Sequence, residues 1–440
     1  MAEGLGREVE VAAEGALPVA WTGVEPSALD VLLRRGRVRG LLAILGPAFV
    51  ASVAYVDPGN FATNFAAGSE HGYQLVWVIM MANLMAILVQ YLTSKAGLAT
   101  GRSLPELCRD TFPRRANLLL WIQAEVIAMA TDLAEFVGAA LGLNLVFGVP
   151  LLPAGLITAV LAFAILGLEQ RGYRKFELAI IALLGLLAAG FVYVFFAAGN
   201  QDYPAMARGL IPSLGSGDQL SLAVGIIGAT VMPHVVYLHS ALHTKRITPV
   251  NQKERHTLLR YNRVDCILGL GLAGVVNLSM LCIAAAEFHS RGLTGVSDLG
   301  PVHSQLTVLV GGGAALAFGV ALMASGFSSS SVGTYAGQVV MAGFMNWQIP
   351  LLVRRAVTMI PSLLVLAFAV NTSQALVYSQ IVLSFGIPFA LFPLLLLTRR
   401  PGVMGDMTNR RLTSCLMLAT TLIITGLNIY LLVDTIGGVI

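Results

Sequence analysis

Long apolar segments recur along almost the whole chain after its first forty residues. A membrane-spanning helix needs about 20 mostly apolar residues, and on that criterion we count eleven segments, at 41–68, 73–99, 117–147, 151–168, 176–199, 219–243, 262–288, 305–340, 350–370, 375–397 and 413–433. Only 11% of the residues are charged, whereas soluble domains carry about 25%. Within lipid every backbone N–H and C=O must be paired inside the protein, which leaves helices or closed barrels. Segments of this length predict helices, so we expect an all-α polytopic membrane protein.

The segment 305–340 is long for a single helix. Its polar centre, ASGFSSSS, disfavours two spans, so we expect one span there. The small residues of this centre are typical of close helix packing in membranes, and a contact with a cation is the alternative.

Residues 1–40 precede the first span, and the first 33 are rich in Ala, Glu, Gly and Val. They lack a basic segment followed by an apolar core, so they do not resemble a secretory signal. We expect a disordered tail on the cytoplasmic side. The four cysteines show no CxxC or paired spacing, which indicates neither a disulfide framework nor a thiolate metal site.

Basic residues set the predicted orientation. If the N-terminus is cytoplasmic, all Lys and Arg residues except Arg208 and Arg291 fall in the tail, the cytoplasmic loops or the ends of spans on that side. Cytoplasmic loops of membrane proteins carry this excess. The sequence therefore predicts a plasma-membrane protein with its N-terminus inside and, after eleven spans, its C-terminus outside.

Two spans contain helix-breaking residues at their centres. The first span carries "VDPGN" at 56–60, and the sixth, "GIIGATVMPHVVYLHSALH" at 225–243, carries Met232, Pro233 and His234 at mid-span. Proline removes a backbone donor and glycine releases helical geometry. Asp57 argues against a simple proline kink, because a carboxylate at the bilayer centre costs at least about 2.5–3.5 kcal/mol and is functional by default.

The two breaks lie five spans apart, an odd number, so the halves that contain them would be inverted across the membrane. Paired interrupted helices at matching positions of two inverted halves indicate a transporter binding site at their interface. We therefore expect a first repeat at 41–199, a second at 200–400, and an appended eleventh span within 401–440.

The residues at the breaks favour a cation. Asp57 offers a carboxylate, Asn60 an amide oxygen and Met232 a thioether sulfur. Oxygen ligands suit hard ions, whereas a thioether contributes little to Mg²⁺ or Ca²⁺, so the mixed set favours a first-row ion such as Mn²⁺ or Fe²⁺. Core packing is the alternative role for Met232.

The motifs "DPGNFATN" and "GATVMPH" resemble the two hallmark motifs of the Nramp family of proton-coupled divalent metal transporters, and the likeness covers roughly 40–435. The resemblance implies the LeuT-type fold, a five-plus-five inverted repeat with helices 1 and 6 interrupted and eleven spans in all. It also implies import of Mn²⁺ and Fe²⁺ with protons. It assigns metal binding to Asp57, Asn60, Met232, the carbonyls of Ala54 and Ala229, and Gln380 in some conformations.

The third span carries three acidic residues, Glu125, Asp132 and Glu135. At 100° per residue, Asp132 lies about 20° from Glu125 and Glu135 about 60° from Asp132. A proton relay is one interpretation; a structural ion-pair network with Arg354 and Arg355 is the other, and the two are compatible. The resemblance implies a relay through Asp132 and Glu135, with Asp57 and His234 nearby.

Metal binding and proton release are linked by charge. A bound dication favours the ionised form of a carboxylate, so metal binding at Asp57 would displace a proton that neighbouring acids can accept. Near the second break, His239 and His243 lie about 140° and 180° around the helix from His234. This spacing excludes a three-histidine ligand set on one face; His234 can titrate near neutral pH, whereas His239 and His243 are expected to line the pathway or serve structure.

Other functions find less support. No HExxH set for a membrane metalloenzyme and no GxxxxGK[ST] loop for nucleotides occurs, so we expect no enzyme, no resident cofactor, no nucleotide and no nucleic acid partner. Paired breaks favour alternating access over a channel. Another LeuT-type cation-coupled symporter and a non-transporting metal sensor remain alternatives. The sequence does not rank Mn²⁺ against Fe²⁺.

Overall fold

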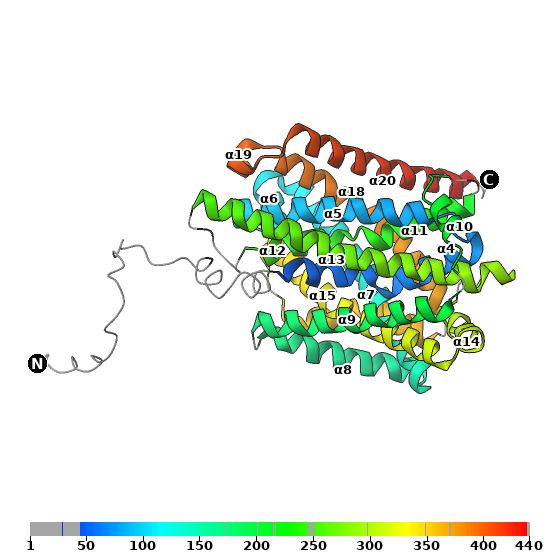
Figure 1. Ribbon diagram of the computed structural model, residues 1–440. Helices are drawn as coiled ribbons and strands as arrows, with labels where there is room; N and C mark the ends of the chain where they lie inside the picture. Colours follow the sequence, from blue (N-terminus) through cyan, green and yellow to red (C-terminus); the bar gives the residue numbers. More distant parts are fainter. Residues whose placement is uncertain are drawn as a thin grey trace, which may run out of the picture.

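The computed structural model describes residues 29, 45–170, 172–199, 201–213, 215, 217–244, 249, 251–296, 298–347, 349–368 and 371–437. The expected tail at 1–40 lies outside them apart from Leu29. The described residues form a bundle of long helices whose axes lie roughly along one line (Figure 1), and no strand occurs among them.

Eight helical stretches are long and apolar enough to cross a membrane, and each falls on one of the expected spans. They are α5 (Val76–Thr100), α7 (Arg114–Phe147), α9 (Tyr173–Ala198), α11 with α12 (Gly217–Thr230 and Pro233–Leu242), α13 (Gln252–Glu287), α15 (Gly312–Met345), α18 (Thr372–Thr398) and α20 (Arg411–Gly437). The other three expected spans are shorter or divided. They correspond to α3, η1 and α4 (Pro47–Val53, Ala54–Val56 and Pro58–His71), to α8 (Leu151–Gln170), and to α16 with α17 (Leu351–Thr358 and Ile360–Ala367).

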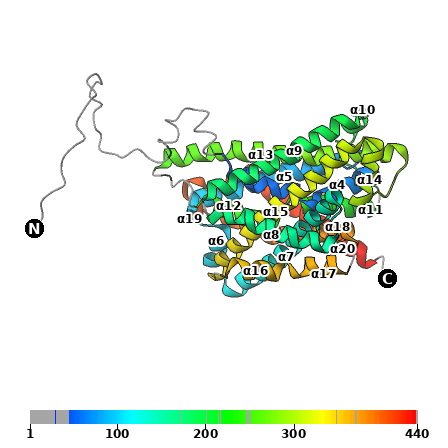
Figure 2. The same cartoon turned by 90° about the horizontal axis from the view of Figure 1, so that it is seen from below.

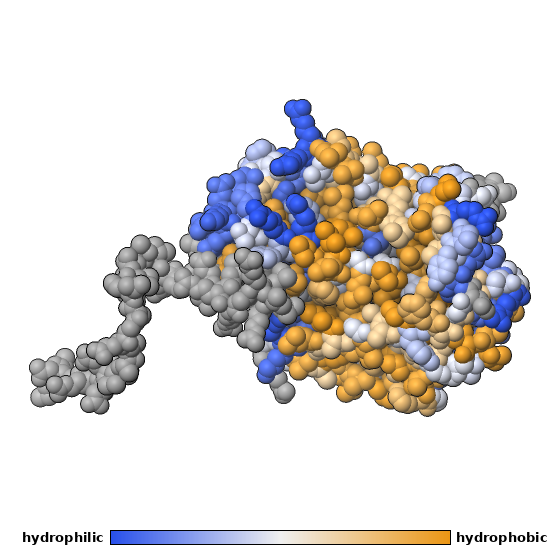
Figure 3. All heavy atoms as spheres, viewed as in Figure 1, coloured by the Kyte–Doolittle hydropathy of each residue, from blue (hydrophilic) through white to orange (hydrophobic). Residues whose placement is uncertain are grey.

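The surface supports burial in lipid. Figure 3 shows apolar residues over the middle of the molecule and hydrophilic residues gathered at its two ends. Large apolar side chains on this surface are strongly exposed, including Leu119 at 68%, Val160 at 68% and Phe196 at 73%. Apolar surface this extensive would promote association in water, whereas acyl chains cover it without penalty.

The expected single span at 305–340 is wrong at its start. Residues 299–309 form a separate helix, α14 (Leu299–Leu309), and the chain turns at Gly311, whose φ of 123° suits glycine alone. The membrane helix α15 begins only at Gly312. Within α15, a Cβ added to Gly326 would lie 2.5 Å from the Cβ of Ala139, so this glycine lets α15 pack closely against α7.

The two interrupted helices run in opposite directions. The second half of the first span, α4, and the first half of the sixth, α11, lie toward the same end of the bundle, whereas α12 lies toward the other end (Figures 1 and 2). This arrangement is the one expected of inverted halves.

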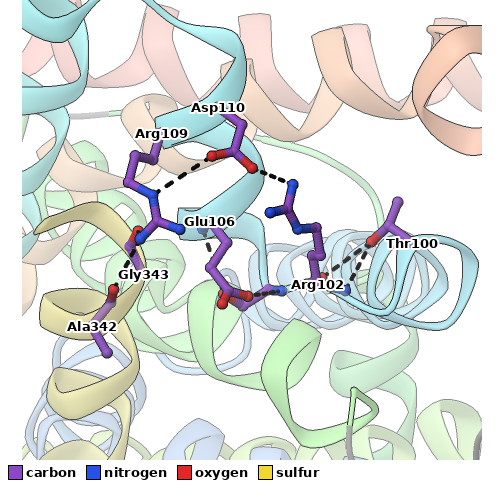
Figure 4. A network of polar contacts seen from close by, with 8 residues as sticks. Thr100, Arg102, Glu106, Arg109, Asp110, Ala342 and Gly343 are labelled. Carbon is purple, nitrogen blue, oxygen red and sulfur yellow. Dashed lines mark hydrogen bonds and ion pairs between the residues drawn. The ribbon is translucent and has the colours of Figure 1, made fainter. Parts of the chain in front are cut away.

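Three short helices at the ends of the bundle were not expected: α6 (Leu104–Thr111), α10 (Tyr203–Arg208) and α19 (Pro401–Met404). Figure 4 shows how α6 is attached: Arg109 donates to the carbonyls of Ala342 and Gly343 at the end of α15, at 3.2 and 2.7 Å, and also pairs with Asp110 at 3.6 Å. Asp110 pairs with Arg102 as well. Arg109 of α6 and Arg102, which precedes this helix, are therefore satisfied by neighbouring acceptors.

The eleventh span, α20, is fastened to α18 by a polar contact. Pro388 has no N–H, so the carbonyl of Ser384 loses its helical partner. The amide of Asn428 donates to this carbonyl at 2.8 Å, and the hydroxyl of Ser384 donates to the amide oxygen of Asn428 at 2.9 Å.

Candidate metal site

At the first break, residues that typically begin a helix stand in the middle of an apolar segment. Asp57 has an extended backbone (φ −81°, ψ 170°) between η1 and α4 and forms the N-cap of α4. Its carboxylate accepts from the N–H of Asn60 at 2.8 Å, and the amide oxygen of Asn60 accepts from the N–H of Asp57 at 3.1 Å. Pro58 occupies the first helical position, where an N–H would have no helical partner. The reciprocal cap holds both side chains at the break.

The second break has no such cap. Between α11 and α12, Met232 has an extended backbone (φ −81°, ψ 118°), and its side chain accepts no hydrogen bond from α12. A thioether is at best a weak acceptor, so a cap is not the reason for a methionine here. Met232 is fully buried, and its sulfur therefore lies inside the protein and away from the acyl chains.

Gln380 of α18 connects the breaks. Its amide nitrogen donates to the carboxylate of Asp57 at 3.2 Å. A Cβ added to Gly59 would lie 1.7 Å from that nitrogen, and a Cβ added to Gly228 of α11 would lie 2.1 Å from the backbone oxygen of Gln380. These two glycines allow α4 and α11 to approach α18, and α11 also packs directly against η1 and α4.

The structure brings together the elements that hold the six predicted metal-binding residues. Each of the six is fully buried: Ala54, Asp57, Asn60, Ala229, Met232 and Gln380. A cluster of three or more His, Cys, Asp or Glu residues able to hold a metal is absent from the described part of the chain.

Several buried polar atoms at the breaks have no partner. The amide oxygen of Gln380, the amide nitrogen of Asn60 and the hydroxyl of Thr230 make no hydrogen bond to the described residues. An unsatisfied buried polar group costs about 1–3 kcal/mol, so such groups indicate a place for a ligand or water. The amide group of Gln380 therefore presents an unpaired oxygen close to the carboxylate of Asp57.

The three acids of the third span occupy different environments on α7. Arg354 donates twice to the carboxylate of Glu125, at 3.2 and 2.7 Å. Arg355 pairs with Asp132 at 3.6 Å and also donates to the carbonyl of Ser330 at 2.9 Å. The ion-pair network expected between α7 and the ninth span is therefore present, and it connects Glu125 and Asp132 to α16.

Glu135 differs from the other two acids. It is fully buried, and neither carboxylate oxygen has a hydrogen-bond partner among the described residues. It lies close enough to Asp132, Asp57 and Arg355 to interact with their charges. A buried carboxyl group without hydrogen-bond partners, near two other acids, has the features expected of a proton carrier.

The histidines after the second break contact different helices. His234 shares a hydrogen bond with Thr131 of α7 at 3.2 Å, whereas His239 bonds to Gln90 of α5 at 2.8 Å. The rings of His239 and His243 contact one another at a tilt of 44°, with centroids 5.2 Å apart. The prediction that the later two face away from His234 agrees with these contacts.

Sequence reasoning missed a polar network around the first break. The amide of Gln90 donates to the hydroxyl of Tyr55, and Asn277 of α13 donates to the carbonyl of Tyr55 at 2.8 Å. Asn277 also accepts from the amide of Asn64 at 3.0 Å. The signal was present, because each of these polar residues interrupts an apolar span, but it did not reveal which residues would meet.

The comparisons agree with this geometry. Residues 48–434 match the family described as natural resistance-associated macrophage protein-like, Nramp. The chain belongs to the Nramp family. Its relatives include the divalent metal cation transporter MntH of Bacillus subtilis, 48% identical over 398 residues that cover 90% of this chain and 93% of the relative. The protein of the same name from Deinococcus radiodurans is 48% identical over 401 residues, covering 91% and 92%.

Solved structures confirm the fold class. A crystal structure of the Eremococcus coleocola manganese transporter, in complex with an aromatic bis-isothiourea substituted compound, is similar to this Nramp-family chain with a TM-score of 0.81 and 33% identity over 89% of this chain and 87% of that one. The nucleobase-cation-symport transporter Mhp1 has a TM-score of 0.60 at 17% identity, covering 88% and 91%. The second likeness shows the fold alone: the LeuT-type arrangement that the Nramp resemblance implied.

Proposed function

We propose that this chain carries divalent transition-metal ions, Mn²⁺ and Fe²⁺ among them, into the cell together with protons by alternating access. The observation that carries the proposal is the meeting of one carboxylate, Asp57, and one unpaired amide oxygen, that of Gln380, at a broken helix. Met232 at the second break supplies a soft donor inside the same core.

The donor types explain the class of ion. Carboxylate, amide and carbonyl oxygens bind any hard dication, and the sulfur of Met232 favours first-row ions over Ca²⁺ and Mg²⁺. Met232 is fully buried and lies just after α11, which packs against η1 and α4, and we propose that its sulfur reaches an ion held by Asp57. The names of the two MntH relatives and of the manganese transporter support this assignment.

Proton coupling rests on the acids of α7. A dication at Asp57 favours the ionised carboxylate and displaces its proton. Glu135 interacts electrostatically with both Asp57 and Asp132, and Asp132 is paired with Arg355. We propose that the proton passes from Asp57 to Glu135 and Asp132, toward the ion pair of Glu125 with Arg354. His234, hydrogen-bonded to Thr131, lies beside this route.

Direction follows from charge and orientation. We place the N-terminus and the basic loops in the cytoplasm and the C-terminus outside, in the cell membrane. Each positive charge that moves inward then gains about 2.3 kcal/mol per 100 mV of membrane potential, which favours uptake. A reporter fused to the C-terminus tests the orientation, and an active cytoplasmic reporter would contradict it.

The test of function is metal uptake by the full chain in proteoliposomes, with a metal-sensitive and a pH-sensitive dye inside. We expect Mn²⁺ entry that an outside-acid gradient accelerates, accompanied by internal acidification. Asp57→Asn abolishes both signals, whereas the control Asp406→Asn, on the exposed η3 (Gly405–Met407), retains them. Robust uptake by Asp57→Asn refutes the site. Binding without uptake would indicate a sensor, and a requirement for Na⁺ would indicate another kind of symporter.

A further inference from the structure

An apolar groove lies on the outer surface between α7, α18 and α20, remote from the helix breaks. Its volume is about 620 Å³, and its walls are almost entirely apolar. The lining includes Leu119 of α7, Phe389 and Phe392 of α18, and Leu418 and Leu422 of α20. All five side chains are exposed, so the groove is open to the surrounding membrane.

The few polar residues in the groove do not make it polar. The hydroxyl of Thr421 donates to the carbonyl of Met417 at 2.8 Å, and that of Thr425 donates to the carbonyl of Thr421 at 2.7 Å. Both hydroxyls are therefore satisfied within α20 and leave methyl groups for the groove. The interior suits acyl chains.

One end of the groove is strongly basic. α7 begins at Arg114 and α20 at Arg411, and Arg115 and Arg410 stand beside them. All four arginines are exposed, and among the described residues none has an ion-pair partner. Arg109 of α6 and Arg102 before it differ, because Asp110 and the carbonyls of α15 satisfy them (Figure 4).

Two of these arginines share a helix face with the groove. At 100° and 1.5 Å per residue, Arg115 lies one turn before Leu119, about 40° away around α7. Arg411 lies two turns before Leu418, about 20° away around α20. In addition, the first turn of α7 has no side-chain cap, and free N–H groups at a helix start attract anions.

We propose that this groove binds one anionic phospholipid of the adjacent leaflet, with acyl chains against α18 and α20 and the phosphate between Arg115 and Arg411. Basic pockets between membrane helices recognise anionic headgroups in this way. A zwitterionic phospholipid fills the same groove but lacks the net negative charge that the unpaired arginines favour.

The test places a fluorescent reporter in the groove. The full chain with Leu418→Trp is reconstituted in phosphatidylcholine vesicles that contain a minor fraction of one brominated lipid. This lipid is either phosphatidylglycerol or phosphatidylcholine, in both cases brominated on the acyl chains. Bromine quenches nearby tryptophan, and the unsubstituted chain supplies the background. We expect stronger quenching by the brominated phosphatidylglycerol, with a preference that falls about fivefold for each arginine removed.

When Arg115→Gln and Arg411→Gln are added to Leu418→Trp, we expect the two brominated lipids to quench the tryptophan equally. The matched control removes two exposed charges from α13, Lys253→Gln with Arg260→Gln, and is expected to keep the preference. Leu422→Trp, one turn deeper, reports the same order if a tryptophan at 418 closes the groove. Equal quenching in the parent, a preference that survives loss of both arginines, an equal loss in the control, or no quenching at either reporter would overturn the proposal.

Discussion

The pair between Arg355 and Asp132 gives the most quantitative prediction. Arg355 is 1% exposed and Asp132 5%, so both charges lie away from water. Removing one partner of a buried ion pair leaves an uncompensated charge and costs about 3–5 kcal/mol. We expect Arg355→Met, which keeps much of the side-chain volume, to lower the free energy of unfolding by about that amount.

The neighbouring pair serves as the control. The side chain of Glu125, the partner of Arg354, is 19% exposed, and Arg354 lines a cavity of about 280 Å³, through which we expect water to solvate the charge when the arginine is lost. Pairs that water reaches contribute about 0.2–1 kcal/mol, and we expect Arg354→Met to cost little more than this range. Both variants remove one arginine from α16, and they differ in the burial of the acid left behind and in the hydrogen bonds that Arg355 alone donates to Ser330 and Thr334.

The assay is reversible unfolding in mixed micelles, with helix content followed against detergent composition. Asp132→Asn combined with Arg355→Met removes both charges and is expected to recover most of the lost free energy. A loss from Arg355→Met no larger than that from Arg354→Met would refute the reasoning. If the losses of unfolding free energy from Asp132→Asn and Arg355→Met simply add in the double variant, the reasoning is refuted as well, since contacting charges must couple.

Three further outcomes concern transport. Met232→Ala is expected to keep Mn²⁺ uptake measurable while Ca²⁺ becomes a competitor; unchanged exclusion of Ca²⁺ in competition uptake would contradict the role of the sulfur. Gly59→Ala, whose Cβ would lie 1.7 Å from the amide of Gln380, breaks a hydrogen bond to a carboxylate worth about 1.5–3 kcal/mol and should slow uptake at least about tenfold. Gly271→Ala, with open space around its Cβ, should match the parent, and an equal effect of both changes would argue against the contact. Glu135→Gln is expected to uncouple Mn²⁺ entry from internal acidification, and the dye recording would contradict the relay if acidification persisted.

The spans were predictable because the bilayer imposes one length and one hydrogen-bonding rule on every segment that crosses it. The breaks were predictable because proline stands beside Asp57 and Met232, at matching positions of two spans five apart, and because a carboxylate is costly at the bilayer centre. Proline alone does not predict a break, since α18 continues through Pro388 and Pro393. Prediction failed in the segments outside the bilayer, where neither the length nor the hydrogen-bonding rule applies. The turn at Gly311 divides an apolar segment that composition alone reads as continuous, and α6 lies at an end of the bundle where the length rule does not apply.

Within the candidate site, the sequence could name residue types but not their partners. That Asp57 and Asn60 would cap one another follows from their spacing, yet the bond from Gln380 depends on how α18 crosses α4. The same limit holds for Gln90 and His239, which lie far apart in the chain. Packing between helices decides these contacts, and one sequence carries little information about crossing geometry.

The polar clasp between Ser384 and Asn428 changes how the last helix should be regarded. Because α20 lies outside the five-plus-five repeat, it could be regarded as an additional helix that a shortened protein does not need. Yet Asn428 satisfies the carbonyl that Pro388 leaves open, and a Cβ on Gly228 would lie 3.0 Å from the Cβ of Ser384. Removal of α20 would therefore leave a backbone oxygen without its partner in the hydrocarbon region, next to a residue that α11 contacts beside the second helix break. The ten helices of the two repeats thus depend on the eleventh for this hydrogen bond.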